Sequence, residues 1–353
     1  MTVRATRMAK TKRNWVSKRA FRMAQCYGLS IGQSIVLWAA VLLMPASIAG
    51  AQTEGLTRLC VLVPHFKDEY WLSVGYGLET EAARQGTELI FFEAGGYSAR
   101  ESQISQLSEC LADGVDAILI GTVSFDHPDL LEAVAGAAEQ RPVFGLVNAL
   151  ASPELSGRIG VDWHDMGYSV GSYLAARHPA GSPPVSAVLI SGPEEAGWTG
   201  PLETGLRKAI EASSLKISAV LGSDTGLREQ LRLVEDALAA WPESDYLIGS
   251  APAIEAAMGH FAQQDLGMAL HPRLIATYVN HTIKRGLIGS QVMAAPFDDP
   301  MEQGRMAVRQ ALGVLTGEDV AVSDGPVIRL MEPNSEELQT LKMSPPTYFP
   351  TIE

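Results

Sequence analysis

The sequence predicts an α/β protein of two Rossmann-like lobes, each a parallel sheet with helices, and a ligand cleft between them. Short apolar runs alternate with amphipathic segments of helical length along most of the chain. Such alternation is typical of parallel sheets covered by helices on both faces. The alternation also occurs in two successive arrays of similar size. No low-complexity linker separates the arrays, so we expect two tightly coupled lobes.

The first array begins with a strand, a loop, a helix and a second strand. Residues 59–63 are continuously apolar, as expected of a strand that is buried on both faces. Beyond the following loop the apolar spacing becomes helical, and Gly86 stands where a helix C-cap is expected. Residues 89–92 form the next apolar run. Two loops, residues 64–71 and 93–97, therefore leave the carboxyl ends of neighbouring strands, where open α/β sheets bind ligands.

The remaining elements continue the alternation. We predict helices over residues 101–111, 130–138, 166–177, 199–212, 227–240, 254–263 and 302–315. We predict strands over residues 117–120, 143–147, 158–161, 185–190, 217–221, 246–248, 273–277, 291–294 and 327–330, and an irregular tail over residues 343–353. The chain then crosses between the lobes near Ile159 and again near residue 295. The predicted lobes are residues 57–160 with 295–322, and residues 161–294 with 323–345.

The amino-terminal segment differs in kind from the rest. The first 53 residues contain eight basic side chains and no acidic one, followed by an apolar run at residues 35–44 and by Ala49-Gly50-Ala51. This order is typical of a secretory signal peptide, here residues 1–51, cleaved near Ala51. The alternative is a membrane anchor, but a run of about ten residues is too short for a helix to cross the ~30 Å hydrocarbon core.

The charge and the cysteines fit an exported protein. Eight of the 27 basic residues leave with the signal peptide while all 40 acidic residues stay, so the formal net charge falls from −13 to −21. Such an acidic protein is not expected to bind nucleic acid or anionic lipid. Cys60 and Cys110 remain as an even pair in an oxidising compartment, and we expect a disulfide between them. The alternative is two buried free thiols.

No catalytic or metal-binding motif is found in the sequence. Gly95-Gly96 lacks the lysine and hydroxyl residue of a phosphate-binding loop, and the seven histidines form no HExxH pattern. The nucleophile motif GxSxG is also missing. We therefore expect no enzyme activity, no cofactor and no metal site.

The strand-end loops share aromatic residues instead. In chain order these are Tyr70, Trp71, Tyr97, Trp163, Trp198 and Tyr278. The plain interpretation is that each ring caps the core at the end of its sheet. An aromatic cleft, however, also suits a ligand with a spread positive charge, because cation–π attraction contributes ~0.5–2 kcal/mol per ring. Sugar stacking is the other option. Asp68, close to the first rings, can face a cation, cap the following helix, or do both.

Four segments together resemble the type I periplasmic binding proteins that sense trimethylamine N-oxide (TMAO). They are LCVLVPHFKDEYWLSVGYG at 59–77, FEAGGYS at 92–98, GVDWHDMGY at 160–168 and EAAMG at 255–259. The resemblance covers about residues 59–315. It implies a two-lobed, non-enzymatic protein that binds TMAO and signals to the periplasmic domain of a sensor histidine kinase controlling TMAO respiration.

The resemblance also implies a set of binding residues. The aromatic cage corresponds to Trp71, Tyr97, Trp163 and Tyr278, with Tyr70 and Asp68 beside them. This agrees with the cleft inferred from the loops. The cysteine pair, Cys60 and Cys110, matches the family as well.

The chain departs from the family pattern at three places. Asp162 stands where we expect proline, residues 295–300 differ from the expected polar run, and Trp198 replaces a small residue. These departures leave room for another small methylated amine or osmolyte as the ligand. Two other classes stay open: the solute-binding component of an ABC importer for a sugar or small cation, and an exported α/β enzyme.

Overall fold

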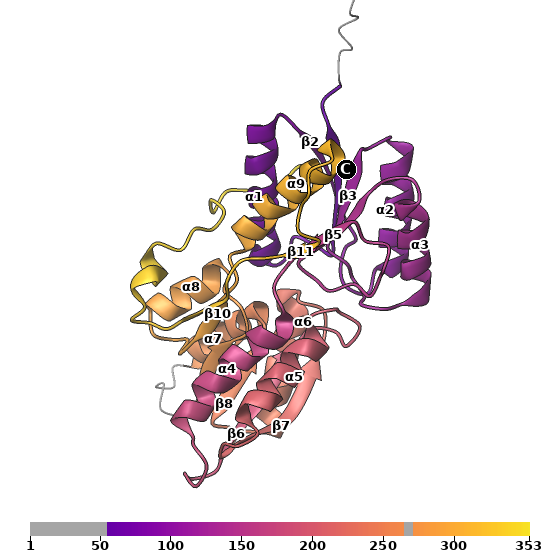
Figure 1. Cartoon of the computed structure of the whole chain (residues 1–353). Helices are drawn as coiled ribbons and strands as arrows, with labels where there is room; N and C mark the ends of the chain where they lie inside the picture. The colour runs from indigo at the N-terminus through magenta and orange to yellow at the C-terminus, as the bar shows by residue number, and fades with distance from the viewer. Residues whose placement is uncertain (1–54, 265–270) are drawn as a thin grey trace, which may run out of the picture. The chain divides into compact units, whose positions relative to one another are not determined.

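Two parallel sheets form the two lobes of the protein (Figure 1). The structure is a computed structural model that describes residues 55–264 and 271–353. The predicted signal peptide lies outside the described residues. The first sheet has the strand order β11-β5-β4-β3-β1-β2 and the second has the order β7-β6-β8-β9. The α/β class predicted from the alternating pattern is therefore confirmed.

The first lobe has helices on both sides of its sheet, α1 and α9 on one side and α2 and α3 on the other (Figure 1). Its strands are β1 (Arg58–Val63), β2 (Glu88–Glu93), β3 (Ala117–Ile120), β4 (Val143–Leu146), β5 (Gly157–Ile159) and β11 (Ser323–Asp324). Its helices are α1 (Glu69–Gln85), α2 (Arg100–Ala112), α3 (Pro128–Ala138) and α9 (Pro300–Thr316). β1 lies between β2 and β3 and is buried on both faces, which explains its uninterrupted apolar sequence.

The second lobe repeats this arrangement. Its strands are β6 (Val185–Ser191), β7 (Leu215–Gly222), β8 (Tyr246–Gly249) and β9 (Arg273–Ala276). Its helices are α4 (Trp163–Arg177), α5 (Thr199–Ile210), α6 (Leu227–Ala240), α7 (Ala251–Gln264) and α8 (His281–Ile288). In both lobes the first strand of the array lies between the second and the third. Neighbouring loops therefore diverge at the carboxyl ends of β1 and β3, and of β6 and β8, which is where such sheets bind ligands.

The chain crosses between the lobes after β5, between α8 and α9, and after β11. β10 (Ala295–Phe297) and β12 (Arg329–Met331) pair antiparallel on the second and third crossings (Figure 1). The predicted lobe boundary after residue 322 is two residues early, because β11 pairs with β5 in the first sheet. Two exposed residues carry no sequence signal for this pairing. The rest of the predicted division stays a prediction.

Some short elements differ from the sequence prediction. The prediction missed α8 and the 3-10 helix η2 (Glu336–Gln339). α8 has eight residues and is capped by Asn280, whose side chain accepts a hydrogen bond from the Ile283 N–H. So few residues contain little periodicity. The predicted strand over residues 291–294 is reduced to a single bridge between Leu274 and Val292.

The carboxyl-terminal tail runs back over the first lobe. The ring of Tyr348 packs against that of Tyr76 on α1, with 5.1 Å between the centroids. The backbone N–H of Glu353 donates to the carbonyl oxygen of Phe91 on β2. Figure 1 accordingly places the chain end beside β2 and α9. The tail is irregular, as the sequence predicts, and it covers part of one sheet edge.

Glycines let two pairs of helices cross at backbone contact. In the first lobe a Cβ at Gly77 on α1 would overlap the carbonyl oxygen of Met301 on α9. In the second lobe a Cβ at Gly205 on α5 would overlap the carbonyl oxygen of His164 on α4. These glycines are needed for close approach, and not for their helical conformation.

A disulfide joins Cys60 on β1 to Cys110 on α2, two residues that are 50 positions apart. Closing a loop of this length removes entropy from the unfolded chain, which stabilises the folded state by about 4 kcal/mol in the chain-entropy model. We therefore expect the paired replacement Cys60→Ala with Cys110→Ala to lower the free energy of unfolding by about 2–4 kcal/mol. Urea unfolding measures this. An unchanged urea midpoint would contradict the stabilising role, and reductant should have no effect on the double variant.

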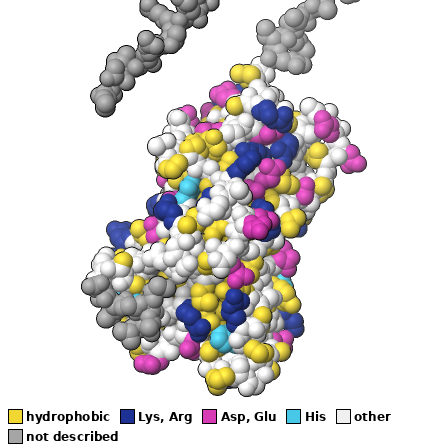
Figure 2. All heavy atoms as spheres, turned by 90° about the vertical axis from the view of Figure 1, so that its left-hand side faces the viewer, with side chains coloured by type: hydrophobic (Ala, Val, Ile, Leu, Met, Phe, Trp, Pro, Cys, Tyr) yellow, Lys and Arg dark blue, Asp and Glu magenta, His cyan; other side chains and the backbone are white. Residues whose placement is uncertain are grey.

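The surface mixes charges of both signs. On the face shown in Figure 2, acidic and basic side chains are interspersed with apolar ones, without a wide area of one sign. Within residues 55–264 and 271–353, no helix is long and apolar enough to cross a membrane.

Candidate ligand-binding site

Side chains from both lobes enclose a small cavity of about 20 Å³ at the carboxyl ends of the strands. It is lined by Asp68, Tyr70, Trp71, Tyr97, Val147, Asn148, Trp163, Trp198, Thr225 and Tyr278. The structure thus places all six sequence-predicted binding residues on one wall or another of the same cavity. We call these ten residues the cage. This volume is far below the ~300–1,000 Å³ of pockets for drug-sized ligands, so even a ligand of a few heavy atoms fits only if the walls of the cage move apart.

The rings of the cage meet mainly edge to face. Tyr278 is central: its ring centroid lies 5.3 Å from that of Tyr70 and 6.2 Å from those of both Trp163 and Trp198. The two indoles are tilted, with centroids 5.5 Å apart. These rings and those of Trp71 and Tyr97 are only 3–5% exposed. A ligand can therefore enter only if the two lobes move apart.

Asp68 joins the lobes at the floor of the cage. As the N-cap of α1, its Oδ1 accepts a hydrogen bond from the Tyr70 N–H. From the second lobe, the Tyr278 hydroxyl donates to Oδ2 at 2.6 Å and Asn280 Nδ2 donates to Oδ1 at 3.1 Å. Burial raises the pKa of Asp68, and the three hydrogen bonds oppose that shift. Asp68 is therefore both a helix cap and a cage residue.

The Tyr70 hydroxyl also donates its proton to a buried carboxylate. It donates to Asp298 Oδ2 at 2.6 Å and accepts from Gln303 Nε2 at 3.1 Å. Both Tyr70 and Tyr278 thus direct their only hydroxyl proton to a buried carboxylate, and no Lys or Arg is among the ten lining residues. Donation to a carboxylate makes these two rings more electron-rich, and the face of such a ring, which is the negative part of its quadrupole, favours a positively charged group.

A second group of hydrogen-bond donors converges around Tyr97. Asn148 Nδ2 donates to the Tyr97 oxygen at 3.2 Å. Burial raises the pKa of Tyr97, and hydrogen bonds from Asn148, Trp71 and Trp198 oppose the shift. Within the described residues no acceptor takes the Tyr97 proton. This side of the cage can therefore donate to an oxygen atom of a ligand.

A strained turn orients two of these groups. Val147 has a φ of +64°, which is rare for a β-branched residue, and the Asn148 N–H donates to the Leu146 carbonyl across it. The turn aims the Asn148 amide at Tyr97 and the Val147 carbonyl at Trp163 Nε1, which donates at 3.2 Å. Strain of this type costs about 1–3 kcal/mol and is commonly retained at functional sites.

A second contact between the lobes closes the rim. His65 Nε2 lies 2.9 Å from Thr225 Oγ1 and 3.2 Å from Asp224 Oδ1. Because the Lys67 N–H donates to His65 Nδ1, Nε2 carries the proton and is the donor. The Tyr97 N–H also donates to Asp224 Oδ2. Burial acts to raise the pKa of Asp224, but His65 and the Tyr97 N–H outweigh it and lower the pKa.

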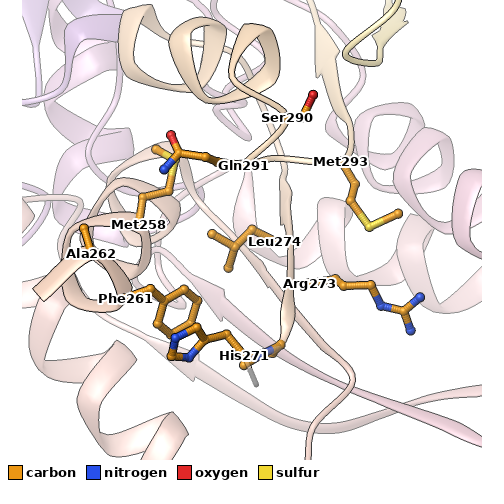
Figure 3. Close-up of a pocket in the computed structure, with 10 residues that line it drawn as sticks. Met258, Phe261, Ala262, His271, Arg273, Leu274, Ser290, Gln291 and Met293 are labelled. Carbon is orange, nitrogen blue, oxygen red and sulfur yellow. The ribbon is translucent and has the colours of Figure 1, made fainter. Parts of the chain in front are cut away.

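A larger hollow of about 220 Å³ lies at the other end of β9 (Figure 3). The rings of Phe261 and His271 stack there with centroids 4.0 Å apart, and the guanidinium of Arg273 points away from them. The hollow shares no lining residue with the cage and lies at the amino-terminal end of its strand. We place the candidate site in the cage, because there the rings and the polar groups of two lobes converge.

The binding set predicted from the sequence left out five residues: Val147, Asn148, Trp198 and Thr225, which line the cage, and Asn280, which donates to Asp68. Trp198 was noted as an aromatic loop residue but not included in the binding set. Asn148, Thr225 and Asn280 follow β4, β7 and β9, so their positions at the carboxyl ends of strands were the available signal. Polar residues at such ends are common in loops, and only the structure distinguishes these three by their contacts.

The chain matches known proteins over most of its length. The family model of periplasmic binding proteins and the sugar-binding domain of the LacI family matches residues 57–325. The periplasmic protein TorT of Escherichia coli K12 is 35% identical over 298 residues, which are 83% of this chain and 84% of TorT.

Solved structures give the same picture. TorT in a complex with the TorS sensor domain without ligand is 36% identical, covers 84% of this chain and all of that one, and superposes with a TM-score of 0.74. The same complex in the presence of TMAO gives 0.73. A Bradyrhizobium ABC transporter solute-binding protein with bound Bis-Tris is 37% identical over 85% of this chain and 90% of its own, with a TM-score of 0.70. This chain therefore belongs to the periplasmic binding protein family that includes TorT.

Proposed function

We propose that the protein is a periplasmic sensor that binds TMAO, or a close methylated amine, and signals to the periplasmic domain of a TorS-like sensor histidine kinase. The observation that carries the proposal is that one cavity is lined both by aromatic rings with a carboxylate and by hydrogen-bond donors around Tyr97. Export would follow from the signal peptide predicted over residues 1–51. The protein would act by binding alone, without catalysis, as the family suggests.

The polarity of the cage matches the charge distribution of TMAO. The nitrogen carries a formal positive charge and three methyl groups, which suit the rings of Tyr70, Trp163 and Tyr278 and the nearby Asp68 carboxylate. The oxygen is a strong acceptor, which suits the donors around Tyr97. A sugar would need several free polar groups, but most of those in the cage are already hydrogen-bonded to protein.

The relatives support both halves of the proposal. TorT was solved with the TorS sensor domain, with and without TMAO. Binding would bring Asp68 and Tyr278 together across the lobes, as in the structure, and thereby shift the chain toward the closed form. A kinase that recognises only one form would then respond to the ligand.

Titration calorimetry on the mature chain from Gln52 tests the ligand. We expect saturable heat with TMAO, weaker heat with trimethylamine and betaine, and none with ribose. Trimethylamine lacks the oxygen acceptor, and betaine adds a carboxylate beside Asp68. A binding heat with ribose and no binding heat with TMAO would overturn the proposal.

A solute-binding component of an ABC importer is the second candidate. One observation favours it: the Bradyrhizobium relative is named as such a component and holds Bis-Tris, also an amine with three carbon substituents. Co-elution of the mature chain with the sensor domain of a histidine kinase encoded beside it would support the sensor. A neighbouring permease and ATPase, with no kinase, would support the importer.

A further inference from the structure

β10 lies on the second crossing between the lobes (Figure 1), and Asp298 is the residue that follows it. Its side chain is fully buried, at 0% exposure. Oδ2 accepts hydrogen bonds from the Tyr70 hydroxyl at 2.6 Å and from Gln303 Nε2 at 2.8 Å. Oδ1 is buried too, and it has no hydrogen-bond partner within the described residues. A carboxyl group with one unpartnered buried oxygen is costly to keep unless it has a role.

The contact with Tyr70 connects this crossing to the cage. Tyr70 is a wall of the cavity, and Asp298 lies on one of the three crossings between the lobes, where a change in the angle between the lobes would be accommodated. The next residue, Asp299, adopts a φ of +48°, so the crossing here is conformationally restricted. One O–H···O hydrogen bond thus joins a ligand-facing ring to the hinge.

We propose that Asp298 is a positioning residue that couples the occupied cage to the hinge, its ionised carboxylate holding Tyr70 in the orientation that binds ligand. The inference rests on the proposed function of the cage. When Asp298 is ionised, the Tyr70 hydroxyl donates its hydrogen bond to this carboxylate and not to the cavity. The electron-rich ring of Tyr70 then faces the ligand. A neutral side chain at this position is a weaker acceptor and releases the hydroxyl to rotate.

The surroundings of Asp298 bring its pKa into a pH range in which binding can be measured. Burial raises its pKa to about 6, against the hydrogen bonds from Tyr70 on α1 and Gln303 on α9. The only nearby charge that acts on it in the same direction as burial is that of Asp299, which itself caps α9 and also has a raised pKa because of burial. Arg329 on β12 packs over Phe297 and acts on Asp299.

The sign of the expected pH dependence follows from these facts. If only the ionised form binds, the apparent affinity is scaled by the ionised fraction. With a pKa of about 6, that fraction is near one at pH 7.5 and about a quarter at pH 5.5. TMAO binding should therefore weaken about fourfold between pH 7.5 and pH 5.5.

Calorimetric titration with TMAO between pH 5.5 and 7.5 tests the proposal in four proteins. The wild type should lose affinity about fourfold on acidification. Asp298→Asn, which keeps the shape and removes the charge, should bind weakly at every pH. Asp299→Asn removes the neighbouring charge that raises the pKa of Asp298, so its loss of affinity should begin at a lower pH than in the wild type. Asp68→Asn should bind weakly but keep the wild-type slope. Protonation of TMAO itself affects all four alike, so the profiles are compared with one another.

Two results would overturn the inference: wild-type affinity in Asp298→Asn, or a wild-type pH slope in that variant. Tyr70→Phe adds a check, because it should flatten the slope while leaving Asp298 ionisable. If the fold of Asp298→Asn is in doubt, Tyr70→Phe alone decides.

A measurement without ligand separates this inference from the proposed function. Because the pKa of Asp298 is raised on folding, the native state binds its proton more tightly than the unfolded chain does, and stability from this group falls as pH rises through 6. The melting temperature of Asp298→Asn minus that of the wild type should therefore rise from pH 5 to pH 7. No rise would refute the buried titration even if TMAO binds. A rise without TMAO binding would support the buried titration of Asp298 and reject TMAO as the ligand.

Discussion

Trp71→Ala and Trp163→Ala should each weaken TMAO binding at least about 30-fold, since a desolvated ring contributes ~2 kcal/mol to binding of a cation. Both rings are almost completely buried in the cage, where no solvent can replace them. The cavity is small, so a lost ring also leaves a void beside a ligand of a few heavy atoms. Titration calorimetry at pH 7.5 measures the change.

Phenylalanine substitutions separate the two roles of the indoles. Trp163 uses its N–H on the Val147 carbonyl, so Trp163→Phe keeps a ring and is expected to lose little beyond that bond. The Trp71 N–H contributes to the donor side around Tyr97, so Trp71→Phe should weaken binding more. Tyr168→Ala, an exposed ring on α4 outside the cage, is the control and should bind like the wild type.

Melting curves must accompany these titrations. A variant that melts like the wild type and binds no TMAO supports the cage. Unchanged affinity in both alanine variants would mean that the ligand lies elsewhere, and the hollow beside Phe261 would then be the next site to test.

Gly205→Ala and Gly77→Ala should each lower the free energy of unfolding by about 3 kcal/mol, which is in the upper range for overpacking. Alanine normally stabilises a helix relative to glycine, so the expected sign is the opposite of what helix propensity predicts. At both positions the added methyl would overlap a carbonyl oxygen of the facing helix, and a backbone atom cannot move aside as a side chain can.

Gly136→Ala in α3 is the matched control. A Cβ at this position meets nothing within 4 Å, so alanine should stabilise the chain by about 0.5–1 kcal/mol. Urea unfolding followed by circular dichroism measures all three variants. If Gly205→Ala unfolds at the same urea midpoint as Gly136→Ala, then α4 and α5 are not in backbone contact.

The sequence alone was enough for the α/β class, most long elements and six cage residues. Long elements are predictable because their periodicity is repeated many times, as in α6, whose bounds agree with the prediction. The short helix α8 and the two-residue strand β11 were not predictable, because they depend on contacts with distant segments. Aromatic residues at the ends of strands were recognisable because parallel sheets bring all such ends to one edge.

The sequence by itself determined which residues come together. Local hydrophobic patterns specify the strands, and the parallel topology places four aromatic residues at the sheet edges that face the cleft: Tyr70, Trp71, Tyr97 and Tyr278. Only the tertiary structure decided how they are used. Asp68 serves two lobes at once, and the Tyr70 proton goes to Asp298, 228 residues along the chain. Hydrogen-bond direction and burial depend on neighbours brought together by folding, and no local pattern in the chain encodes them.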